Sequence, residues 1–479
     1  MTIAHDHLNL VDGNWVGDGA RLDNISPSNT GDLVGRYAKG SPADVDAAVA
    51  SARAALRSWA AISPQVRADL LDGVGSRLLA ERNEIGRLLS REEGKTLAEG
   101  IGETARAGQI FKFFAQEALR IEGDALPSVR PGVDVEILRE PIGVVGLVTP
   151  WNFPIAIPAW KIAPALAYGN CVVLKPADLT PGCAHILARL LHEAGCPAGV
   201  FNLVMGPGST VGQHLVEHPD VDAISFTGSV PVGRAIASSA IAGMKRIQLE
   251  MGGKNPMLVL DDADLDVAVR VCLDGAFFST GQRCTASSRI IVHRKIHDEF
   301  VDRLSTAMTA LHVGDALDPA TQIGPVASER QLEGNLRYVA MARDEGAQVI
   351  GGERVEAKTP GYYQRPALFL GATNQMRVSR EEIFGPCAAV IPCDDLDEGL
   401  AIANDTPFGL SSGICTTSLS SARTFKRLSS AGMVMVNLPT AGVDYHVPFG
   451  GRKASSFGPR EQGRHAREFY TATKTAYIG

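Results

Sequence analysis

Apolar and polar positions follow two different rhythms along the chain, and each rhythm predicts a different kind of element. Residues 40–120 are rich in alanine and carry helix-start signals at Pro42-Ala43-Asp44 and Ser63-Pro64, so this stretch is predicted to be helical. From residue 142 onward, short apolar runs with the length of buried strands alternate with helical segments. The first strands predicted in this way are Ile142–Val148, Cys171–Leu174, Val200–Val204 and Ala223–Phe226.

A second series of apolar runs occupies the carboxyl-terminal half of the chain. Strands that alternate with helices at this spacing indicate parallel sheets, so the sequence predicts two α/β units. Ser128–Glu140, with Pro131-Gly132 at its middle, predicts a projecting hairpin. No Gly/Ser-rich linker marks a boundary, and we therefore expect domains that interleave along the chain. The strands of the second series are Asn255–Leu260, Arg289–Val292, Ala388–Ile391 and Met433–Asn437.

Length and composition narrow the class of protein. With about 150 residues per domain as a prior, 479 residues suggest two or three domains. A chain that is 45% hydrophobic and 21% charged has the composition of an ordinary globular protein, which excludes bulk disorder and a fibrous repeat. The net charge of −7, without a run of five like charges, argues against nucleic acid or an anionic membrane as the main partner. An anionic small molecule remains compatible with this charge.

The sequence also carries expectations about location. The first ten residues contain no apolar core, so we expect no secretory signal. The most lipid-like stretch, residues 153–174, is interrupted by three prolines and Lys161, so we expect no membrane segment. The eight cysteines contain no C-x-x-C pair and follow no zinc spacing, which disfavours a metal site or a disulfide framework. We therefore expect a cytoplasmic protein with reduced thiols.

Two glycine-rich turns each follow a predicted strand and lead into a helix. The first, from Gly206 to Gly212, has one residue more than the usual dinucleotide fingerprint, so a plain turn explains it equally well. The second runs from Phe226 to Gly233, and Ser229 within it is placed to offer a hydroxyl and an N–H to an anion. Such turns bring the backbone close to a phosphate at the positive end of a helix. Together they predict a dinucleotide-type phosphate site.

Two other motifs point to different enzyme classes, and both match poorly. Residues 228–235 imitate a Walker A loop but lack its Lys and Ser/Thr, while Gly94-Lys95-Thr96 lacks the glycine that the motif requires at position 89. Residues 409–413 fit the G-x-S-x-G of a serine hydrolase, with Ser411 as nucleophile. That motif needs a strand before it and a helix after it, whereas here a strand-like run follows. A chance match is favoured, and the serine hydrolase stays as a rival hypothesis.

Three residues with useful chemistry lie at the ends of predicted strands or in glycine-flanked turns. Cys284 has polar neighbours, and Arg283 beside it could favour the thiolate, although a structural thiol is the alternative. Glu250 stands between apolar residues, a setting that raises a carboxyl pKa towards the range of a general base. Asn152 offers an uncharged N–H donor for an oxyanion, or it merely forms a turn. With a dinucleotide-type sheet, these residues predict oxidation of a carbonyl through a thioester.

Over essentially its whole length the sequence resembles the aldehyde dehydrogenase superfamily. One departure is Ser456, where the family usually has glycine; we expect it to affect loop geometry and not the chemistry. The resemblance is carried by seven motifs in the family's order: Pro150-Trp151-Asn152-Phe153-Pro154, Leu174-Lys175-Pro176-Ala177-Asp178, Phe226-Thr227-Gly228-Ser229, Leu249-Glu250-Met251-Gly252-Gly253, Gly281-Gln282-Arg283-Cys284, Glu381-Glu382-Ile383-Phe384-Gly385-Pro386 and Pro448-Phe449-Gly450-Gly451.

The resemblance implies an α/β fold of the aldehyde dehydrogenase type, with three parts. Residues 1–119 and 141–251 would form a Rossmann-type, dinucleotide-binding cofactor domain, and residues 252–459 an α/β catalytic domain. Residues 120–140 and 460–479 would form a small β extension for oligomerisation. Because such an extension pairs between subunits in the family, a homodimer or homotetramer is expected.

The resemblance also implies the reaction, which is NAD(P)-dependent oxidation of an aldehyde to a carboxylic acid through a cysteine thiohemiacetal and a thioester. Cys284 would attack the aldehyde, and Asn152 with the Cys284 N–H would hold the oxyanion. Glu250 would activate the water that hydrolyses the thioester. Lys161 is a further candidate for the catalytic set.

For the cofactor, the resemblance assigns Lys175 and Asp178 to the adenosine ribose and Gly228 with Ser229 to the pyrophosphate. A carboxylate at position 178 accepts hydrogen bonds from ribose hydroxyls and repels a 2′-phosphate, so NAD is expected in preference to NADP, which remains possible. Glu382 and Phe384 would contact the nicotinamide half. The remaining cofactor-binding candidates are Trp151, Gly208, Gly212, Phe226, Thr227 and Gly233.

The substrate is expected to carry a carboxylate. Residues 437–448 and 458–463 resemble a group within the superfamily, the α-ketoglutaric semialdehyde (2,5-dioxopentanoate) dehydrogenases. An acidic aldehyde needs a cationic or hydrogen-bonding anchor. Open alternatives are a broad-specificity enzyme, a dehydrogenase of succinic, glutaric or aromatic aldehydes, and a catalytically silent binding protein. The candidate anchors are Arg283, Gln282, Tyr445, His446 and Arg106, and for Arg106 a solvated helix face is an equally good explanation.

Overall fold

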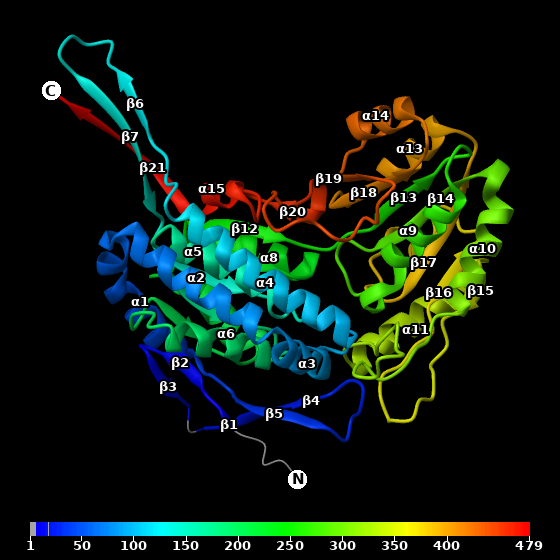
Figure 1. Ribbon diagram of the computed structural model, residues 1–479, viewed down its shortest axis with the longest axis horizontal. Coiled ribbons are helices and arrows are strands. Elements are labelled where there is room, and N and C mark those ends of the chain that lie inside the picture. Colours follow the sequence, from blue (N-terminus) through cyan, green and yellow to red (C-terminus); the bar gives the residue numbers. More distant parts are fainter. Residues whose placement is uncertain (1–5, 18) are drawn as a thin grey trace.

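The computed structural model describes residues 6–17 and 19–479, and its two α/β units lie side by side (Figure 1). Part of the amino-terminal segment for which we expect no secretory signal, residues 1–5, lies outside the described residues. Within the described residues, no helix combines the length and the apolar character needed to span a bilayer.

An eight-stranded sheet forms the core of the first unit, in the order β20-β12-β11-β8-β9-β10-β2-β3. The neighbours from β12 to β10 are parallel, as the sequence predicts, and antiparallel strands stand at both edges. The strands are β12 (Arg246–Glu250), β11 (Ala223–Thr227), β8 (Val144–Val148), β9 (Cys171–Lys175) and β10 (Phe201–Leu203), with β2 (Asn9–Val11), β3 (Asn14–Val16) and β20 (Ser456–Phe457) at the edges.

Helices predicted for residues 40–120 are confirmed and lie over this sheet. Three of them begin after a serine or threonine whose side chain caps the helix, and Ser41 and Thr96 form capping boxes. Every residue of α5 (Ala156–Ala167) is buried, because α5 lies between the sheet and α4. The other helices of this unit are α1 (Pro42–Ala61), α2 (Pro64–Ala80), α3 (Arg82–Glu93), α4 (Leu97–Glu117), α6 (Pro181–Glu193), the π-helical turn η1 (Gly208–Gly212), α7 (Gln213–Glu217) and α8 (Val230–Ala242).

A seven-stranded sheet forms the second unit, in the order β15-β16-β17-β14-β13-β18-β19, and only β15 runs antiparallel to its neighbour. The strands are β13 (Asn255–Val259), β14 (Ser287–His293), β15 (Gln348–Gly351), β16 (Ala367–Leu370), β17 (Cys387–Cys393), β18 (Ser411–Cys415) and β19 (Met433–Val436). The helices are α9 (Leu265–Phe277), α10 (His297–Thr309), α11 (Glu329–Asp344), α12 (Arg377–Arg380), α13 (Leu396–Asn404) and α14 (Leu419–Leu428), with short 3₁₀ turns η2 (Phe278–Gly281) and η3 (Arg294–Ile296).

A three-stranded antiparallel arm projects from the body of the first unit (Figure 1). The predicted hairpin is confirmed, because β6 (Asp124–Pro127) and β7 (Asp134–Pro141) pair across the turn at residues 128–133. The carboxyl-terminal strand β21 (Thr471–Ile478) pairs along the full length of β7. A smaller sheet comprises β1 (Asp6–His7), β4 (Arg21–Ile25) and β5 (Leu33–Ala38), and the remaining turns are η4 (Lys453–Ser455), η5 (Arg464–Ala466) and α15 (Arg467–Tyr470).

The carboxyl-terminal segment crosses the expected domain boundaries. Strand β20 falls within the range 252–459, yet it pairs with β12 of the first unit. Glu461 and Gln462, which the sequence assigned to the oligomerisation extension, are 2% and 0% exposed and contact Trp160, Lys161 and Arg106 of the first unit. The segment between β20 and the arm therefore packs against the first unit.

Candidate active site

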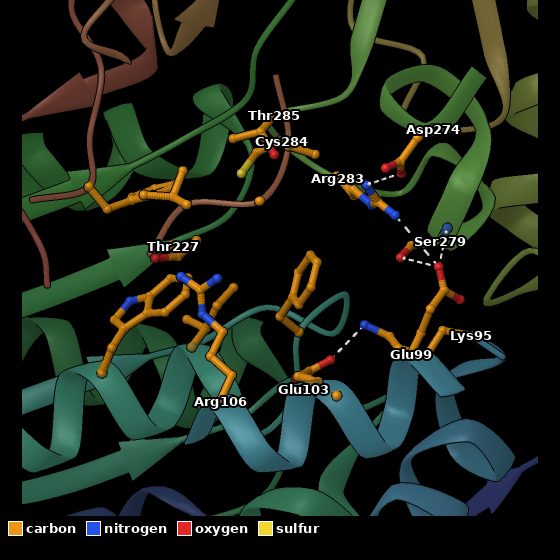
Figure 2. A pocket seen from close by; sticks show the side chains of 18 residues that line it. Lys95, Glu99, Glu103, Arg106, Thr227, Asp274, Ser279, Arg283, Cys284 and Thr285 are labelled. Carbon is orange, nitrogen blue, oxygen red and sulfur yellow. Dashed lines mark hydrogen bonds and ion pairs between the residues drawn. The ribbon is translucent and has the colours of Figure 1, made fainter. Parts of the chain in front are cut away.

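A cavity of about 390 Å³ lies between α4 of the first unit and the segment that precedes β14 of the second. Its walls combine aromatic rings, among them Phe153 and Trp160, with charged side chains. Figure 2 shows Cys284 on one wall and Arg106 projecting towards the cavity from α4 on the opposite side. A thiol and a cation thus face the same enclosed volume.

A tight turn places Cys284 at this wall. Ser279, Thr280 and Gly281 have φ angles of 51°, 54° and 63°, which is left-handed backbone that non-glycine residues rarely adopt. A Cβ on Gly281 would lie 2.2 Å from the carbonyl oxygen of Gly385, so glycine is required there. The Cys284 carbonyl accepts a hydrogen bond of 2.8 Å from Asn255 Nδ2. The surrounding structure therefore fixes the backbone on both sides of the thiol.

The electrostatic surroundings of Cys284 differ from the sequence prediction. Burial raises the pKa of the thiol well above its usual value, and the carboxyl groups of Glu382 and Glu250 raise it further. Arg283, which was expected to favour the thiolate, directs its guanidinium to Glu99 and Asp274, each at 3.5 Å (Figure 2). That expectation is wrong, because neighbours in sequence point their side chains in different directions. Activation of the thiol must come from another group.

Asn152 is anchored beside the Cys284 segment. Its side chain is buried in the loop between β8 and α5, and its Nδ2 donates to the carbonyl of Gln282 at 2.9 Å. A side-chain amide has two N–H donors, so one remains for an oxyanion. Asn152 is 4% exposed and is not among the residues that line the cavity, so its role as an oxyanion donor stays a prediction.

A buried ion pair that sequence reasoning missed holds the loop of Asn152. Lys95 Nζ contacts Glu103 Oε2 at 2.6 Å and donates to the carbonyl of Asn152 at 2.7 Å. The other oxygen of Glu103 accepts the N–H groups of Ile155 and Ala156, both at 3.1 Å. The Lys95 and Glu103 side chains are 1% and 2% exposed. The only sequence signal for this pair is Gly94-Lys95-Thr96, which imitates a phosphate-binding loop.

Glu250 ends strand β12, 2% exposed, and does not line the cavity. Burial raises its pKa well above the usual value, and the neighbouring Glu461 contributes in the same direction. The pKa of Glu250 is therefore raised, as the sequence predicts from its apolar neighbours. Ser456 Oγ donates to Glu250 Oε2 at 2.5 Å. The expectation that Ser456 would affect loop geometry alone is wrong, because its hydroxyl contacts this carboxylate directly.

Lys161 also lies outside the cavity, fully buried on α5. It forms an ion pair with Glu461 and donates to Ser225 Oγ at 2.7 Å. Trp160 Nε1 donates to the other oxygen of Glu461 at 2.6 Å. Lys161 therefore belongs to a buried polar cluster on the side of Glu250, whose pKa it lowers.

Candidates for the ribose half of a cofactor come together at the carboxyl ends of the parallel strands. Lys175 ends β9, and its Nζ lies 3.0 Å from Asp178 Oδ1. A Cβ on either Gly208 or Gly212 would lie 3.8 Å from the Lys175 side chain, so the glycine turn faces this lysine. In α/β sheets, nucleotides bind at this edge.

The second glycine turn packs on Phe226 and caps α8. A Cβ on Gly228 would lie 2.5 Å from the Phe226 ring, and one on Gly233 would lie 2.4 Å from the sulfur of Met251. Ser229 is exposed at the helix N-terminus and makes no capping bond with its side chain, so its hydroxyl and the helix N–H groups are open to an anion. Thr227, beside this turn, lines the cavity.

The nicotinamide candidates come from both units, and two of them are in contact. Phe384 has a φ of 60°, and its ring meets the ring of Trp151 edge-on, with centroids 5.4 Å apart. Glu382 Oε1 accepts the N–H of Gly253 at 2.8 Å, and burial raises its pKa to about 7. An open helix N-terminus and a carboxylate for ribose hydroxyls are groups that dinucleotide-binding sites use. Among the residues that the structure describes, no cluster of His, Cys, Asp or Glu could hold a metal ion.

Of the five candidate substrate anchors, Arg106 and Arg283 line the cavity. Gln282 is 1% exposed, and its side-chain oxygen accepts the N–H of Ala327 at 3.0 Å, away from the cavity. Tyr445 and His446 are also absent from the lining, to which their loop contributes residues 441–443 instead.

The two arginines differ in their partners. Arg283 is already paired with two carboxylates. Arg106 donates to the neutral Gln462 at 3.0 Å, and within the described part of the chain it forms no ion pair. Burial lowers its pKa from an ordinary value of 12.5, while the charges of Glu103 and Asp444 oppose this shift. Arg106 is thus the cavity cation whose charge is least compensated, and it does not lie on a solvated helix face.

Ser411 does not have the geometry of a serine nucleophile. It is the first residue of β18 and is 1% exposed. A nucleophile elbow lies on a turn from a strand into a helix, whereas here the serine begins a strand.

Known proteins similar to this chain are aldehyde dehydrogenases. Residues 15–476 match the model of the aldehyde dehydrogenase family. The chain is 44% identical to an alpha-ketoglutaric semialdehyde dehydrogenase of Bacillus subtilis, covering 100% of this chain and 99% of the relative. It is 42% identical to an alpha-ketoglutarate semialdehyde dehydrogenase of Haloferax volcanii, covering 98% of each. Among solved structures, a betaine aldehyde dehydrogenase from Staphylococcus aureus in complex with NAD⁺ matches with a TM-score of 0.96 and 32% identity, covering 98% of this chain and 95% of that chain.

Proposed function

The chain belongs to the aldehyde dehydrogenase family, and on this premise we propose that it oxidises α-ketoglutaric semialdehyde (2,5-dioxopentanoate) to the dicarboxylic acid with NAD as the preferred acceptor. The family fixes the enzyme class, an NAD(P)-dependent aldehyde dehydrogenase, and so confirms the resemblance seen in the sequence. The substrate and the residue roles below are our proposal.

In the proposed reaction, the Cys284 thiol gives up its proton to solvent, its sulfur forms a bond to the aldehyde carbon, and the C=O electron pair moves to oxygen, which yields the oxyanion of a thiohemiacetal. Asn152 Nδ2 and the Cys284 backbone N–H hold the oxyanion. A bound NAD supplies the acceptor for the hydride that leaves this carbon, and the thioester remains on Cys284. Glu250 takes a proton from a water molecule, which attacks the thioester and releases the acid and the thiol.

The observation that carries the choice of substrate is the partly compensated cation in the cavity. Arg106 faces the same volume as Cys284, and it pairs only with a neutral amide among the described residues. A guanidinium in such a site favours a carboxylate, because a charge-assisted hydrogen bond in a buried place is about twice as strong as a neutral one. An aldehyde with an acidic far end fits this arrangement.

The proposal extends to cofactor choice, assembly and location. Asp178 favours NAD, because its carboxylate beside Lys175 would repel a 2′-phosphate. The projecting arm, with exposed Leu126, Leu138 and Tyr477, supports a homodimer or homotetramer in which arms pair between subunits. All eight cysteines are free thiols, which supports a cytoplasmic location.

A panel of aldehydes assayed with both cofactors tests the proposal. We expect kcat/KM to be higher for α-ketoglutaric semialdehyde than for succinic and glutaric semialdehydes, aromatic aldehydes and a neutral aldehyde of equal length. Arg106→Gln is expected to lower kcat/KM for the acidic substrate by roughly tenfold to a hundredfold and to leave the neutral aldehyde nearly unchanged. Lys112→Gln, on the same helix but paired with Asp72, is the matched control. Preference for the neutral aldehyde would overturn the role of Arg106, and cofactor binding without turnover would favour a silent binding protein.

A further inference from the structure

We propose that Ser456 is a positioning residue for Glu250, whose hydroxyl orients the carboxylate and favours its ionised form for thioester hydrolysis. The inference rests on the proposed function, in which Glu250 is the general base. It assigns to strand β20 a part in the second half of the reaction.

Strand pairing brings the two residues together. Ser456 and Glu250 are partners in the antiparallel register of β20 and β12. The Cβ atoms of directly opposed residues in such a pair lie about 5 Å apart. A side chain as short as serine can therefore reach the carboxylate, and the observed distance from Oγ to Oε2 is 2.5 Å.

The direction of this hydrogen bond follows from the other partner of the hydroxyl. The N–H of Gly451 donates to Ser456 Oγ at 2.6 Å. Because Oγ accepts that bond, its own proton is free to be donated, and the Glu250 carboxylate is the group that accepts it. The chain from Gly451 through Ser456 to Glu250 thus ends on an acceptor oxygen, and this bond is stronger when the acceptor is an ionised carboxylate.

The groups around Glu250 favour its protonated form, and the bond from Ser456 opposes them. Burial and the carboxyl group of Glu461 raise its pKa, and Cys284 shares the same surroundings. Ser456 opposes the rise most, ahead of the cations Lys161 and Arg460. Without the hydroxyl, Glu250 would hold its proton to higher pH and would lose the contact that fixes its oxygen.

Only one step of the proposed reaction needs Glu250 as a carboxylate. Attack by Cys284 and hydride transfer precede the hydrolysis of the thioester. Ser456→Ala should therefore keep the first burst of reduced cofactor and slow the decay of the acyl-enzyme. We expect hydrolysis at neutral pH to be roughly tenfold slower or more, with the acid limb of its pH profile displaced to higher pH. Ser456→Thr keeps the hydroxyl and should restore most of the hydrolysis rate and most of the wild-type pH profile.

Acid-quench trapping of the acyl-enzyme measures this step directly across pH. The matched control is Ser455→Ala, because the neighbouring serine hydroxyl accepts from the N–H of Gly409 and does not touch Glu250. We expect Ser455→Ala to keep the wild-type profile of acyl-enzyme decay. A wild-type rate and profile in folded Ser456→Ala overturns the inference. Glu250→Gln separates the role of Glu250 as general base from the role of Ser456. If Glu250→Gln hydrolyses the acyl-enzyme at the wild-type rate, the proposed role of Glu250 fails. If Glu250→Gln stalls at the acyl-enzyme while Ser456→Ala does not, only the role of Ser456 fails.

Discussion

Replacing Lys95 by methionine removes the buried cation that supports the oxyanion loop, and we expect it to lower both stability and rate. Methionine is similar in length and apolar, so the cavity wall keeps most of its volume. What is lost is the 2.6 Å contact with Glu103, the 2.7 Å hydrogen bond to the Asn152 carbonyl and a longer, 3.9 Å contact with the buried Glu93.

The magnitude follows from burial and from the remaining partners. Breaking a buried ion pair on one side costs about 3–5 kcal/mol, because an uncompensated charge stays behind. Glu103 keeps the N–H groups of Ile155 and Ala156, so we expect the lower end, about 3 kcal/mol in the free energy of unfolding. Asn152 keeps its tether to Gln282 but loses the donor at its carbonyl. A displacement of about 1 Å at such a position lowers the rate by roughly a hundredfold.

Urea unfolding and steady-state kinetics measure both effects, and a double-mutant cycle with Glu103→Gln isolates the pair. The matched control is Lys112→Met, which breaks a half-exposed pair with Asp72 and should cost only about 0.2–1 kcal/mol. If Lys95→Met unfolds with the wild-type free energy, or if its effect simply adds to that of Glu103→Gln, the reasoning is refuted.

Three further changes test other parts of the site. Asn152→Ala should lower kcat by roughly a hundred- to a thousandfold while the circular dichroism spectrum stays unchanged, since one oxyanion donor is lost; a smaller loss removes Asn152 from that role. Asp178→Ala should narrow the ratio of kcat/KM for NAD over NADP, and equal efficiencies in the wild type would contradict our assignment. Burial lowers the pKa of Lys254 from 10.5 to about 7, and its Nζ has no hydrogen-bond partner among the described residues. Because the unfolded state binds more protons than the folded state between those pH values, the free energy of unfolding of the wild type should rise from about pH 7 to 10.5. Lys254→Met should be more stable than the wild type near neutrality and should lack this rise. If the two proteins show the same dependence of unfolding free energy on pH, this prediction is contradicted.

Much of the fold could be predicted from the sequence because the central strands are continuous apolar runs. Parallel strands buried on both faces leave such runs, and β8, β9 and β11 coincide with them within two residues. Strand β20 was missed because two residues, Ser456 and Phe457, carry no periodic signal. Its pairing with β12 joins positions more than two hundred residues apart, and no local pattern contains that information.

In the candidate site, too, local features could be predicted from the sequence and long-range contacts could not. Cys284, Asn152 and the glycine turns could be singled out by their residue types and flanking glycines, and of these Cys284 lines the cavity. The partners that set their charge could not be found, because contacts such as Glu461 with Lys161 span three hundred residues. Adjacency was also misleading: Arg283 is next to Cys284 in sequence but pairs with Glu99 and Asp274.

The charge of the thiol is therefore a property of the assembled site, and Glu382 offers a direct test. After burial, the Glu382 carboxyl is the largest contribution to the raised pKa of Cys284. Glu382→Gln removes that negative charge, so the thiol pKa should fall. A fall of one unit means roughly ten times more thiolate at neutral pH and correspondingly faster alkylation by iodoacetamide without cofactor. Glu381→Gln, which alters the pair with Arg377 one residue away, should leave the alkylation rate unchanged. Slower or unchanged alkylation of Glu382→Gln would mean that burial alone keeps the thiol protonated.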